Sequence, residues 1–208
     1  MTAYKPKNKL ARREGVDLSL KTFGTKSHAS LLKRLSIVPG FKSVRRKFAK
    51  VSDYGRQLRE KQKLKRIYNV TEKKMSLYFD KAVITKGNTA EFLIRMLENR
   101  LDNVVFRLHL APTRAAARQL VAHGHVSVNG KKIGIPSYNT KVGDKVEFGK
   151  AKSLEIPYIK EFATQKNVEI AKWLKKTGNT GEVVADIQLS DYQEPVDMAL
   201  VIEFYSKL

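Results

Sequence analysis

The stretch RMLENRLDNVVFRLHLAPTRAAARQLVAHGHVSVNGKKIGIPSYNTKVGDKVEF, from Arg95 to Phe148, decides the fold of this chain. Its first part carries apolar residues at positions i, i+3, i+4 and i+7, namely Leu101, Val104, Val105 and Leu108. That spacing places all four side chains on one face of a helix, where they can be buried together. The sequence therefore predicts an amphipathic helix whose apolar stripe faces a core.

A second helix is predicted after a break at Ala111-Pro112. Thr113 is a favourable N-cap, and Gly124 is a favourable residue just beyond the end of a helix over 114–123. Arg114 and Arg118 are one turn apart near the N-terminal end, where backbone N–H groups and the helix dipole favour anions. We therefore predict a phosphate cradle at this end of the helix.

The remainder of the stretch has the pattern of short strands. Asn129-Gly130 is a strong signal for a tight hairpin turn, and it separates His125–Val128 from Lys131–Ile133. A further turn precedes a last strand over Lys145–Phe148. These features predict an α+β fold: a helical N-terminal domain plus a small module of two helices packed on a short, mostly antiparallel sheet.

Charge is distributed unevenly along the 208 residues, which carry a net charge of +21. Residues 1–90 hold 24 Lys and Arg against 6 Asp and Glu, residues 91–150 hold 10 against 5, and residues 151–208 hold 7 against 9. A net positive charge of this size creates an electrostatic field that attracts polyanions, chiefly nucleic acid and anionic membrane. No stretch approaches the ~20 apolar residues of a spanning helix, and no secretory signal begins the chain, so the expected location is cytoplasmic.

The segment from Ser52 to Tyr68 is predicted to be a helix with two different faces. Ser52 is a fair N-cap, and a core stripe is formed by Tyr54, Leu58, Leu64, Ile67 and Tyr68. The other face carries cations with few acidic neighbours in the sequence, and we predict that it contacts phosphates. A second helix is expected from Thr71 to about Thr85, with the core residues Met75, Tyr78, Phe79 and Val83, and a third begins at Asn88.

The two ends of the chain complete the expected domains. Residues 1–50 form a basic N-terminal extension, either a flexible tail or short helices laid over a larger surface. Residues 51–94 form a helical domain, completed by the C-terminal segment 155–208, whose apolar end Met198–Tyr205 returns to pack on the helices of 52–90. Residues 95–150 form the module. The glycine-rich run over 177–189 is expected to be a turn leading into a strand or an extended segment.

Four stretches together resemble one known family. They are LARREG (Leu10–Gly15), SDYGRQLREKQKLKRIY (Ser52–Tyr68), the module over Leu97–Tyr138, and VIEFYSK (Val201–Lys207). Over the full chain they resemble the fourth protein of the small ribosomal subunit in its bacterial, zinc-free form. The module alone is similar to an RNA-binding unit of some pseudouridine synthases, tyrosyl-tRNA synthetases and a small heat-shock RNA-binding protein.

The resemblance implies a function and partners. It implies a structural ribosomal protein that binds small-subunit ribosomal RNA at a multi-helix junction of the 5′ domain and nucleates subunit assembly. The implied partners include the fifth small-subunit ribosomal protein, at an interface linked to decoding accuracy, and messenger RNA near the channel through which it enters. Many relatives bind zinc through a Cys-x-x-Cys pair. Asn8 and Ala11 stand at those positions here and the chain has no cysteine, so no metal or other cofactor is expected.

Under this hypothesis the RNA contacts come from basic and polar side chains of the extension, the helix over 52–68 and the module. They act by phosphate contact and shape recognition, because the deep groove of A-form RNA hides its bases. Tyr138 can also stack on a base, whereas Tyr54 fits the core better. The full candidate set is Arg12, Arg13, Arg45, Arg46, Arg56, Arg59, Lys63, Arg66, Arg100, Arg107, Thr113, Arg114, Arg118, Gln119, His123, Asn129, Lys131, Lys132, Ser137 and Tyr138.

The sequence also allows three alternatives to RNA binding to be compared: an enzyme, a DNA-binding protein and a metal site. An enzyme is disfavoured, because the sequence has no GxxxxGK[ST] or GxGxxG loop and no paired histidine and carboxylates at useful spacing. DNA binding stays open, since helix–turn–helix geometry fits residues 89–123. His123 and His125 invite a metal interpretation, but two histidines without cysteine or a nearby acidic cluster make a poor site.

Overall fold

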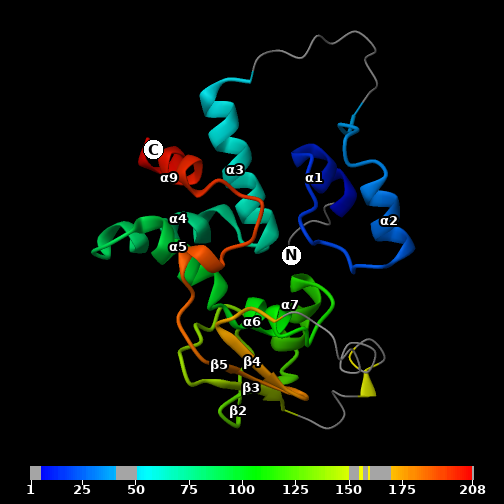
Figure 1. The fold of residues 1–208 in the computed structure, drawn as a ribbon, viewed down its shortest axis with the longest axis vertical. Helices are drawn as coiled ribbons and strands as arrows, with labels where there is room; N and C mark the ends of the chain where they lie inside the picture. Colours follow the sequence, from blue (N-terminus) through cyan, green and yellow to red (C-terminus); the bar gives the residue numbers. More distant parts are fainter. Residues whose placement is uncertain (1–5, 41–50, 150–154, 157–158, 160–169, 208) are drawn as a thin grey trace. The chain divides into compact units, whose positions relative to one another are not determined.

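The computed structural model describes residues 6–40, 51–149, 155–156, 159 and 170–207. The chain divides into two compact units, one of residues 1–80 with 194–208 and one of residues 81–193 (Figure 1). This division differs from the expected domains in three places. The first unit includes residues 1–50, which are expected from the sequence to be a separate extension. Residues 81–94 belong with the module, and of the C-terminal segment only residues from 194 onward join the helical unit.

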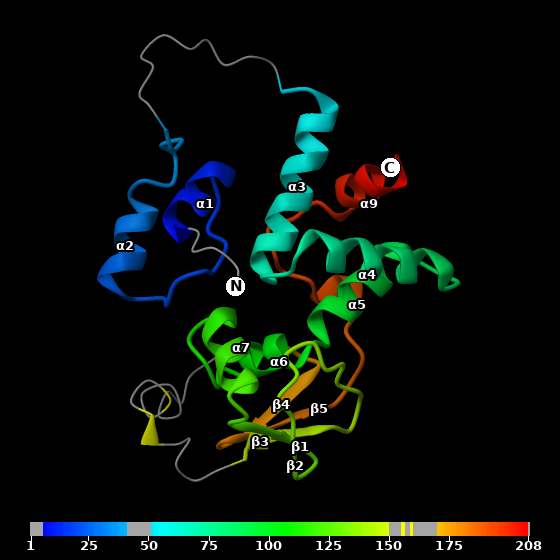
Figure 2. The ribbon, with the colours of Figure 1, turned by 180° about the vertical axis from the view of Figure 1, so that it is seen from behind.

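In the described part of the first unit, the regular secondary structure consists of helices. Its helices are α1 (Lys7–Glu14), α2 (Lys26–Leu32), α3 (Asp53–Ile67), most of α4 (Glu72–Ile84), and α9 (Met198–Ser206). Helices α3 and α9 lie side by side in Figures 1 and 2, although more than a hundred residues separate them in sequence. Val201 and Phe204 of α9 are buried with Leu64 of α3. The predicted return of the C-terminal segment to these helices is confirmed.

Helix α3 begins where the sequence predicts an N-cap. Fewer of its residues are buried than the predicted core stripe includes. The Ser52 hydroxyl accepts a hydrogen bond from the Gly55 N–H at 3.2 Å, as an N-cap does. Tyr54, predicted to be core, is 61% exposed, because it lies in the first turn of α3; its ring centroid is 5.7 Å from that of Phe204. Val83 was also wrongly assigned to the core, since it lies in the exposed last turn of α4.

A four-residue cluster fixes α9 to α3 and α4. Tyr205 donates its hydroxyl proton to Glu72 at 2.9 Å, and Glu72 also accepts from Lys61 at 2.9 Å and Lys65 at 2.8 Å. Burial alone would raise the pKa of Glu72, but hydrogen bonds from Lys65, Lys61 and Tyr205 outweigh it and lower that pKa to about 2. The Lys61 ammonium lies 4.4 Å from the ring centroid of Phe204, a cation–π contact.

Over its described residues 6–40, the basic extension forms short helices. This agrees with the second of the two alternatives expected from the sequence. Ala11, Leu18 and Leu31 are each buried. The carboxylate of Glu14 is only 1% exposed and is bound by Arg66 and, at 3.4 Å, by Arg59. This ion pair anchors α1 to α3. Residues 41–50, with the candidates Arg45 and Arg46, lie outside the described residues.

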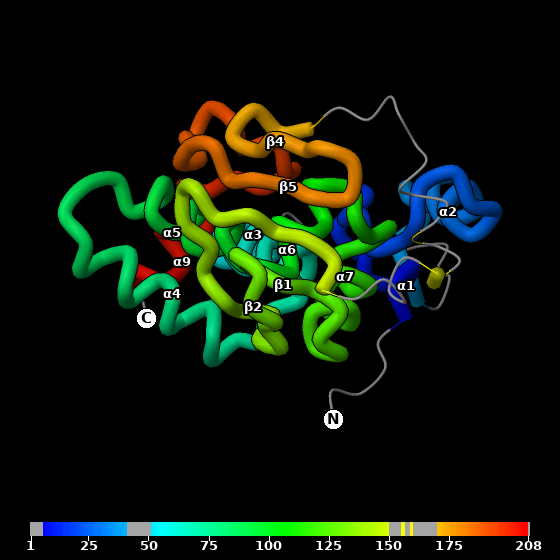
Figure 3. The backbone as a smooth tube through the Cα atoms, turned by 90° about the horizontal axis from the view of Figure 1, so that it is seen from below, coloured from blue at the N-terminus to red at the C-terminus, as the bar shows by residue number. Residues whose placement is uncertain are grey.

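The second unit packs helices on one antiparallel sheet. Its helices are α5 (Thr89–Glu98), α6 (Leu101–Arg107), α7 (Arg114–Ala122) and the short η2 (Leu189–Asp191). Its strands are β1 (Val126–Val128), β2 (Lys131–Lys132), β3 (Lys145–Phe148), β4 (Leu174–Thr177) and β5 (Thr180–Val183), in the order β2-β1-β3-β5-β4. Figure 3 shows the sheet from the face opposite α6 and α7. The predicted α+β fold is confirmed.

Two predicted details of the module hold and one region differs. The stripe of Leu101, Val104, Val105 and Leu108 is fully buried. At the hairpin between β1 and β2, Asn129 and Gly130 both have positive φ, of 50° and 75°, as a tight turn of this kind requires. The sequence did not predict that β4 and β5 would extend the sheet: β5 pairs with β3, for example Val146 with Gly181. Gly181 allows β5 to lie close to α6, because a Cβ there would lie 2.3 Å from Leu108 Cδ1.

Among the described residues, no helix combines the length and the apolar character needed to cross a membrane.

Candidate nucleic-acid interface

Helix α7 has one exposed stripe along its surface. Its buried face carries Ala117, Leu120 and Val121, so the side chains at the complementary helical spacing point outward. The outward positions are Ala115, Arg118, Gln119, Ala122 and His123, of which Arg118 is half-buried. The two alanines keep the surface low between the polar side chains. A low surface with projecting hydrogen-bond donors suits close approach to a rigid polyanion.

Arg118 is held at this surface by a buried carboxylate. Asp102 on α6 is 4% exposed, and its Oδ2 accepts from Arg118 Nη1 at 3.3 Å and from Arg100 Nη2 at 2.6 Å. Arg100 Nε also donates to Asp102 Oδ1 at 3.0 Å. The Arg118 side chain keeps 42% of its surface exposed. The buried carboxylate therefore orients a guanidinium that remains partly exposed to solvent.

A second buried carboxylate organises the other arginines. Glu98 is fully buried, and its two oxygens accept from Arg107 at 3.0 and 2.7 Å. It also accepts from Asn103 Nδ2 at 2.7 Å, and Asn103 Oδ1 in turn accepts from Arg114 Nε at 2.8 Å. The Arg114 guanidinium stacks 4.5 Å from the Phe106 ring centroid. This network ties α5, α6 and α7 together through charge-assisted hydrogen bonds.

Three residues that the sequence predicts as RNA contacts are buried inside the protein. Arg100, Thr113 and Arg114 are all buried, at 7% exposure or less. Thr113 accepts from the Ala116 N–H at 3.2 Å and acts as the N-cap that the sequence predicted. Arg100 and Arg114 serve the internal network described above. The predicted phosphate cradle of Arg114 and Arg118 is therefore wrong in its first member, because Arg114 turns inward onto Asn103 and Phe106.

The hairpin tip adds cations beside the end of α7. Lys131 and Lys132 are exposed on β2. The Lys132 side chain passes over Gly124, where an added Cβ would meet Lys132 Cε at 2.1 Å. Asn129 is exposed, yet its side chain is occupied, because it donates to Asp144 at 2.8 Å and accepts from the Lys145 N–H at 2.9 Å. Lys132 thus extends the polar surface of α7, and Asn129 shapes the turn.

The last two module candidates lie in the connection between β2 and β3. Ser137 is exposed and Tyr138 is half-buried. The Tyr138 carbonyl accepts from the Leu101 N–H at 2.8 Å, which fixes this connection to the start of α6. Both side chains keep their places as predicted RNA contacts.

The basic face of α3 is largely neutralised within the protein. Arg59 and Arg66 bind Glu14, while Lys63 binds Glu60 at 2.6 Å and the Pro195 carbonyl at 3.1 Å. Arg56 pairs with Asp53, but both side chains are well exposed, so solvent weakens this pair. The prediction that these cations have few acidic partners is wrong, because Glu14, far away in sequence, binds two of them. Of the four, Arg56 remains the best placed for RNA.

The extension contributes candidates with different surroundings. Arg12 Nε donates to the Ile37 carbonyl at 2.8 Å, which joins α1 to the segment after α2. Arg13 is exposed on α1. Neither residue has a carboxylate within 4 Å in the part of the chain that the structure describes.

Metal binding has no support from the described side chains. His123 and His125 have ring centroids 6.3 Å apart. Over the described ranges, no group of three or more histidine, cysteine, aspartate or glutamate residues is arranged to hold a metal ion.

Comparison with known proteins identifies the family. Residues 3–98 match the family described as "Ribosomal protein S4/S9 N-terminal domain", and residues 99–146 match "S4 domain". Small ribosomal subunit protein uS4 of Aquifex aeolicus is 47% identical over 211 residues, covering 96% of each chain. The chain belongs to the uS4 family of small ribosomal subunit proteins. The resemblance inferred from the four sequence stretches is confirmed, and so is the expectation of a non-enzymatic ribosomal protein.

Other uS4 relatives match just as fully. Protein uS4A of Alkaliphilus metalliredigens is 44% identical over 201 residues and uS4 of Herpetosiphon aurantiacus is 45% identical over 211 residues, each over at least 96% of both chains. The S4 domain is RNA-binding, and here it includes α6, α7 and β1 to β2. Strands β4 and β5 lie outside that match, although they pair into the same sheet.

Sequence reasoning missed Glu98 as the anchor of the arginine network. Glu98 and Arg107 are nine residues apart and lie on different helices, so no helical spacing links them. A useful signal was present in the run LENRLDN, where two acids stand inside an otherwise basic region and each has arginines within ten residues. Acids in such a setting are often internal partners of arginine.

Proposed function

We propose that this uS4-family protein binds small-subunit ribosomal RNA directly, at a multi-helix junction of the 5′ domain, and that this binding nucleates assembly of the small subunit. The observation that carries the proposal is Arg118, half-exposed on the exposed stripe of α7 and oriented by the buried Asp102. A guanidinium held in this way loses little side-chain entropy when it meets a phosphate. Gln119, His123 and Lys132 extend the same surface.

The mode of recognition follows from the shape and charge of this surface. Its exposed residues are hydrogen-bond donors or cations with small alanines between them. Such a surface reads the backbone geometry of folded RNA, whose minor-groove side is wide and shallow. The protein therefore recognises the shape of a junction, with phosphate contacts that fix its register.

Two further roles belong to the same proposal. The protein contacts the fifth small-subunit ribosomal protein and contributes to decoding accuracy in the cytoplasmic ribosome, near the path of messenger RNA. The support for these roles is membership of the uS4 family. The ribosomal RNA is still the primary partner in this proposal.

The test is binding of the full chain to small-subunit ribosomal RNA over a range of salt concentrations. Phosphate contacts release counterions, so the affinity must fall steeply as salt rises. Competition with duplex DNA separates RNA binding from the open DNA hypothesis. A flat salt response, or equal affinity for duplex DNA, would contradict the proposal.

A further inference from the structure

Lys176 on β4 points to the face of the sheet that the helices cover. The register places it opposite Gly181 of β5, which pairs in turn with Val146 of β3. Residues that are paired across strands share one face of a sheet. Val146 is fully buried, and a Cβ added at Gly181 would meet Leu108 of α6. The Lys176 side chain therefore lies on the inner face, at a position where an apolar side chain is usual.

The burial of Lys176 sets it apart from the other lysines of the second unit. Lys176 is half-buried, whereas every other lysine in the described ranges 81–149 and 170–193 is exposed. Lys175, the next residue, points to the opposite face of the sheet, where its register partner is Glu182. The two neighbouring lysines of β4 thus have the same sequence context but different surroundings.

The amino group of Lys176 has one partner in the described part of the chain. Its Nζ donates to the carbonyl of His109, just beyond the end of α6, at 3.2 Å. No carboxylate among the described residues lies within 4 Å of this nitrogen. A carbonyl brings no negative charge that would balance the ammonium form, and burial penalises that form. Burial therefore lowers the pKa of Lys176 below its usual value.

The lysines of α3 that face the protein interior have a different kind of partner. Lys61 is buried and Lys65 is half-buried, and both bind the carboxylate of Glu72, at 2.9 and 2.8 Å. A carboxylate stabilises the ammonium form, which has no lone pair for attack on an electrophile. Lys176 lacks such a partner among the described residues, so its neutral form is the more accessible in free energy.

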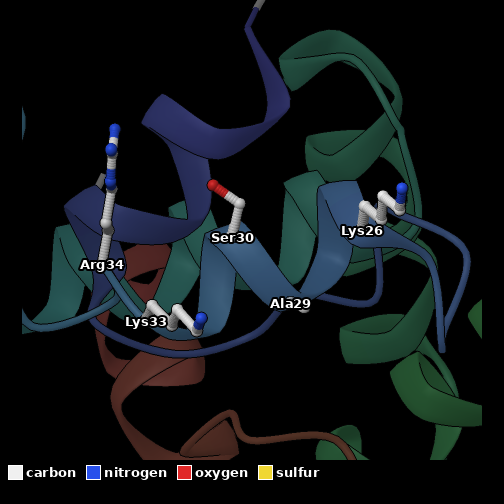
Figure 4. Close-up of a pocket in the computed structure, with 5 residues that line it drawn as sticks. All are labelled: Lys26, Ala29, Ser30, Lys33 and Arg34. Atoms are coloured by element: carbon white, nitrogen blue, oxygen red, sulfur yellow. The ribbon is translucent and has the colours of Figure 1, made fainter.

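Exposed lysines give the opposite comparison. Figure 4 shows Lys26 and Lys33 among the residues that line a hollow along α2. Both side chains are exposed, so reagents reach them easily, but water stabilises their charge. If access alone decided reactivity, these two lysines would react before Lys176. If the surroundings of the amine decide it, Lys176 reacts first.

We infer that Lys176 is a nucleophilic amine and the preferred site of acylation among the described lysines, with small acyl phosphates or thioesters as donors. The neutral amine can keep one N–H on the His109 carbonyl while its lone pair attacks the acyl carbon. A C–N bond forms, and the bond from that carbon to the phosphate oxygen or thioester sulfur breaks. The leaving group takes the electron pair, and the displaced amine proton passes to water.

An aldehyde fits this position less well than an acyl donor. After an amine adds to an aldehyde, water must leave, and a nearby acid assists that step. No carboxyl group of the described residues lies within 4 Å of the Lys176 amine. An acyl donor carries its own leaving group and needs only a neutral amine. Partial burial further favours a compact donor such as an acetyl group.

The test is competition among the lysines of the folded full chain for a trace amount of donor. One arm uses acetyl phosphate and the other acetyl-coenzyme A, and tandem mass spectrometry measures the acetylation rate of each lysine. We expect Lys176 to react about threefold faster than Lys175, Lys26 and Lys33. The arm in which it leads identifies the donor class. A rate for Lys176 no higher than that of Lys175 in both arms would overturn the inference.

The pH dependence separates the reactivity of the amine from access to it. Above pH 7.5 histidine is ordinarily neutral, so the His109 imidazole adds no changing charge, and Glu182 lies on the other face of the sheet. The ratio of Lys176 to Lys175 acetylation should fall as pH rises towards ~10.4, where an ordinary lysine is half neutral. A ratio that stays constant over this range would overturn the inference, because access would then explain it.

The unfolded chain supplies the second control. In concentrated urea the two neighbouring lysines have the same solvent exposure, so their acetylation rates should differ by a factor of about one. A preference for Lys176 that persisted in urea would come from the local sequence and would contradict the role assigned to the fold. RNA is absent from each of these assays, so their outcome is independent of the proposed function.

Discussion

Asp102 and Arg118 form an ion pair with one buried and one exposed partner. The Asp102 carboxylate is almost fully enclosed and also binds Arg100, whereas the Arg118 side chain is 42% exposed 3.3 Å away. The buried partner fixes the direction of the exposed one. The pair therefore connects the internal charge network of the module to the surface that we propose for ribosomal RNA.

The first prediction concerns Arg118 itself. Arg118→Ala should lower the affinity for small-subunit ribosomal RNA about tenfold, or ~1.4 kcal/mol, because one oriented phosphate donor is lost. The melting temperature should change little, since a half-exposed ion pair contributes at most ~1 kcal/mol. Binding and thermal unfolding are measured on the same preparation, with Lys175→Ala as a surface control. A large fall in stability with unchanged affinity would make Arg118 a structural residue only.

Glu98 should be essential to the stability of the module. Glu98→Gln keeps the shape but removes the buried charge that Arg107 and Asn103 contact, and we expect a loss of about 3 kcal/mol in the free energy of unfolding. Urea unfolding measures the loss. Glu182→Gln, at a half-exposed position on β5, is the control and should change stability by less than ~0.5 kcal/mol. Equal effects from the two substitutions would disprove an anchoring role for Glu98.

The close approach of Gly181 to Leu108 gives a prediction about packing. Gly181→Ala would place a methyl group 2.3 Å from Leu108 Cδ1, so the strand or the side chain must shift. We expect a destabilisation of about 1–3 kcal/mol by overpacking. Gly134→Ala is the matched control, because no atom lies within 4 Å of its added Cβ. Calorimetry of both variants checks the prediction, and a Gly181→Ala protein as stable as the control would show that β5 does not pack there.

The Glu72 cluster predicts how the helical unit responds to acid. The pKa of Glu72 is lowered from 4.5 to about 2 in the folded state, so its contribution is present above pH 4.5 and is lost as pH falls towards 2. Glu72→Gln should therefore reduce stability at neutral pH by about 1 kcal/mol, allowing for the screening of a half-exposed group. It should also flatten the pH dependence of stability between pH 4.5 and 2.

Unfolding followed at several pH values tests the Glu72 prediction. Tyr205→Phe removes only one of the hydrogen bonds to Glu72 and should show a smaller effect of the same sign. If Glu72→Gln and the wild-type chain lost stability in parallel from pH 4.5 to 2, the cluster would not be the source of the acid sensitivity.

Much of the module could be predicted because its signals are local. The stripe ending in Leu108, the cap at Thr113 and the turn at Asn129-Gly130 each act within a few residues, and each appears in the structure. The pairing of β5 with β3 could not be predicted in this way. It joins residues more than thirty positions apart, and the glycine-rich run gives no register by itself.

Candidate RNA contacts were harder to predict than elements, for an electrostatic reason. An arginine looks the same in sequence whether it faces RNA or a buried carboxylate. Arg66 faces Glu14, fifty-two residues earlier, and Arg100 lies inside on Asp102. Only the folded structure shows which carboxylates form ion pairs with arginines inside the protein.

Footprinting of small-subunit ribosomal RNA by the full chain tests the central claim most directly. We predict protection concentrated at one junction of the 5′ domain, retained against excess duplex DNA and weakened by Arg118→Ala. Protection spread evenly along the RNA, or abolished by an equal amount of duplex DNA, would contradict direct and shape-specific binding of ribosomal RNA.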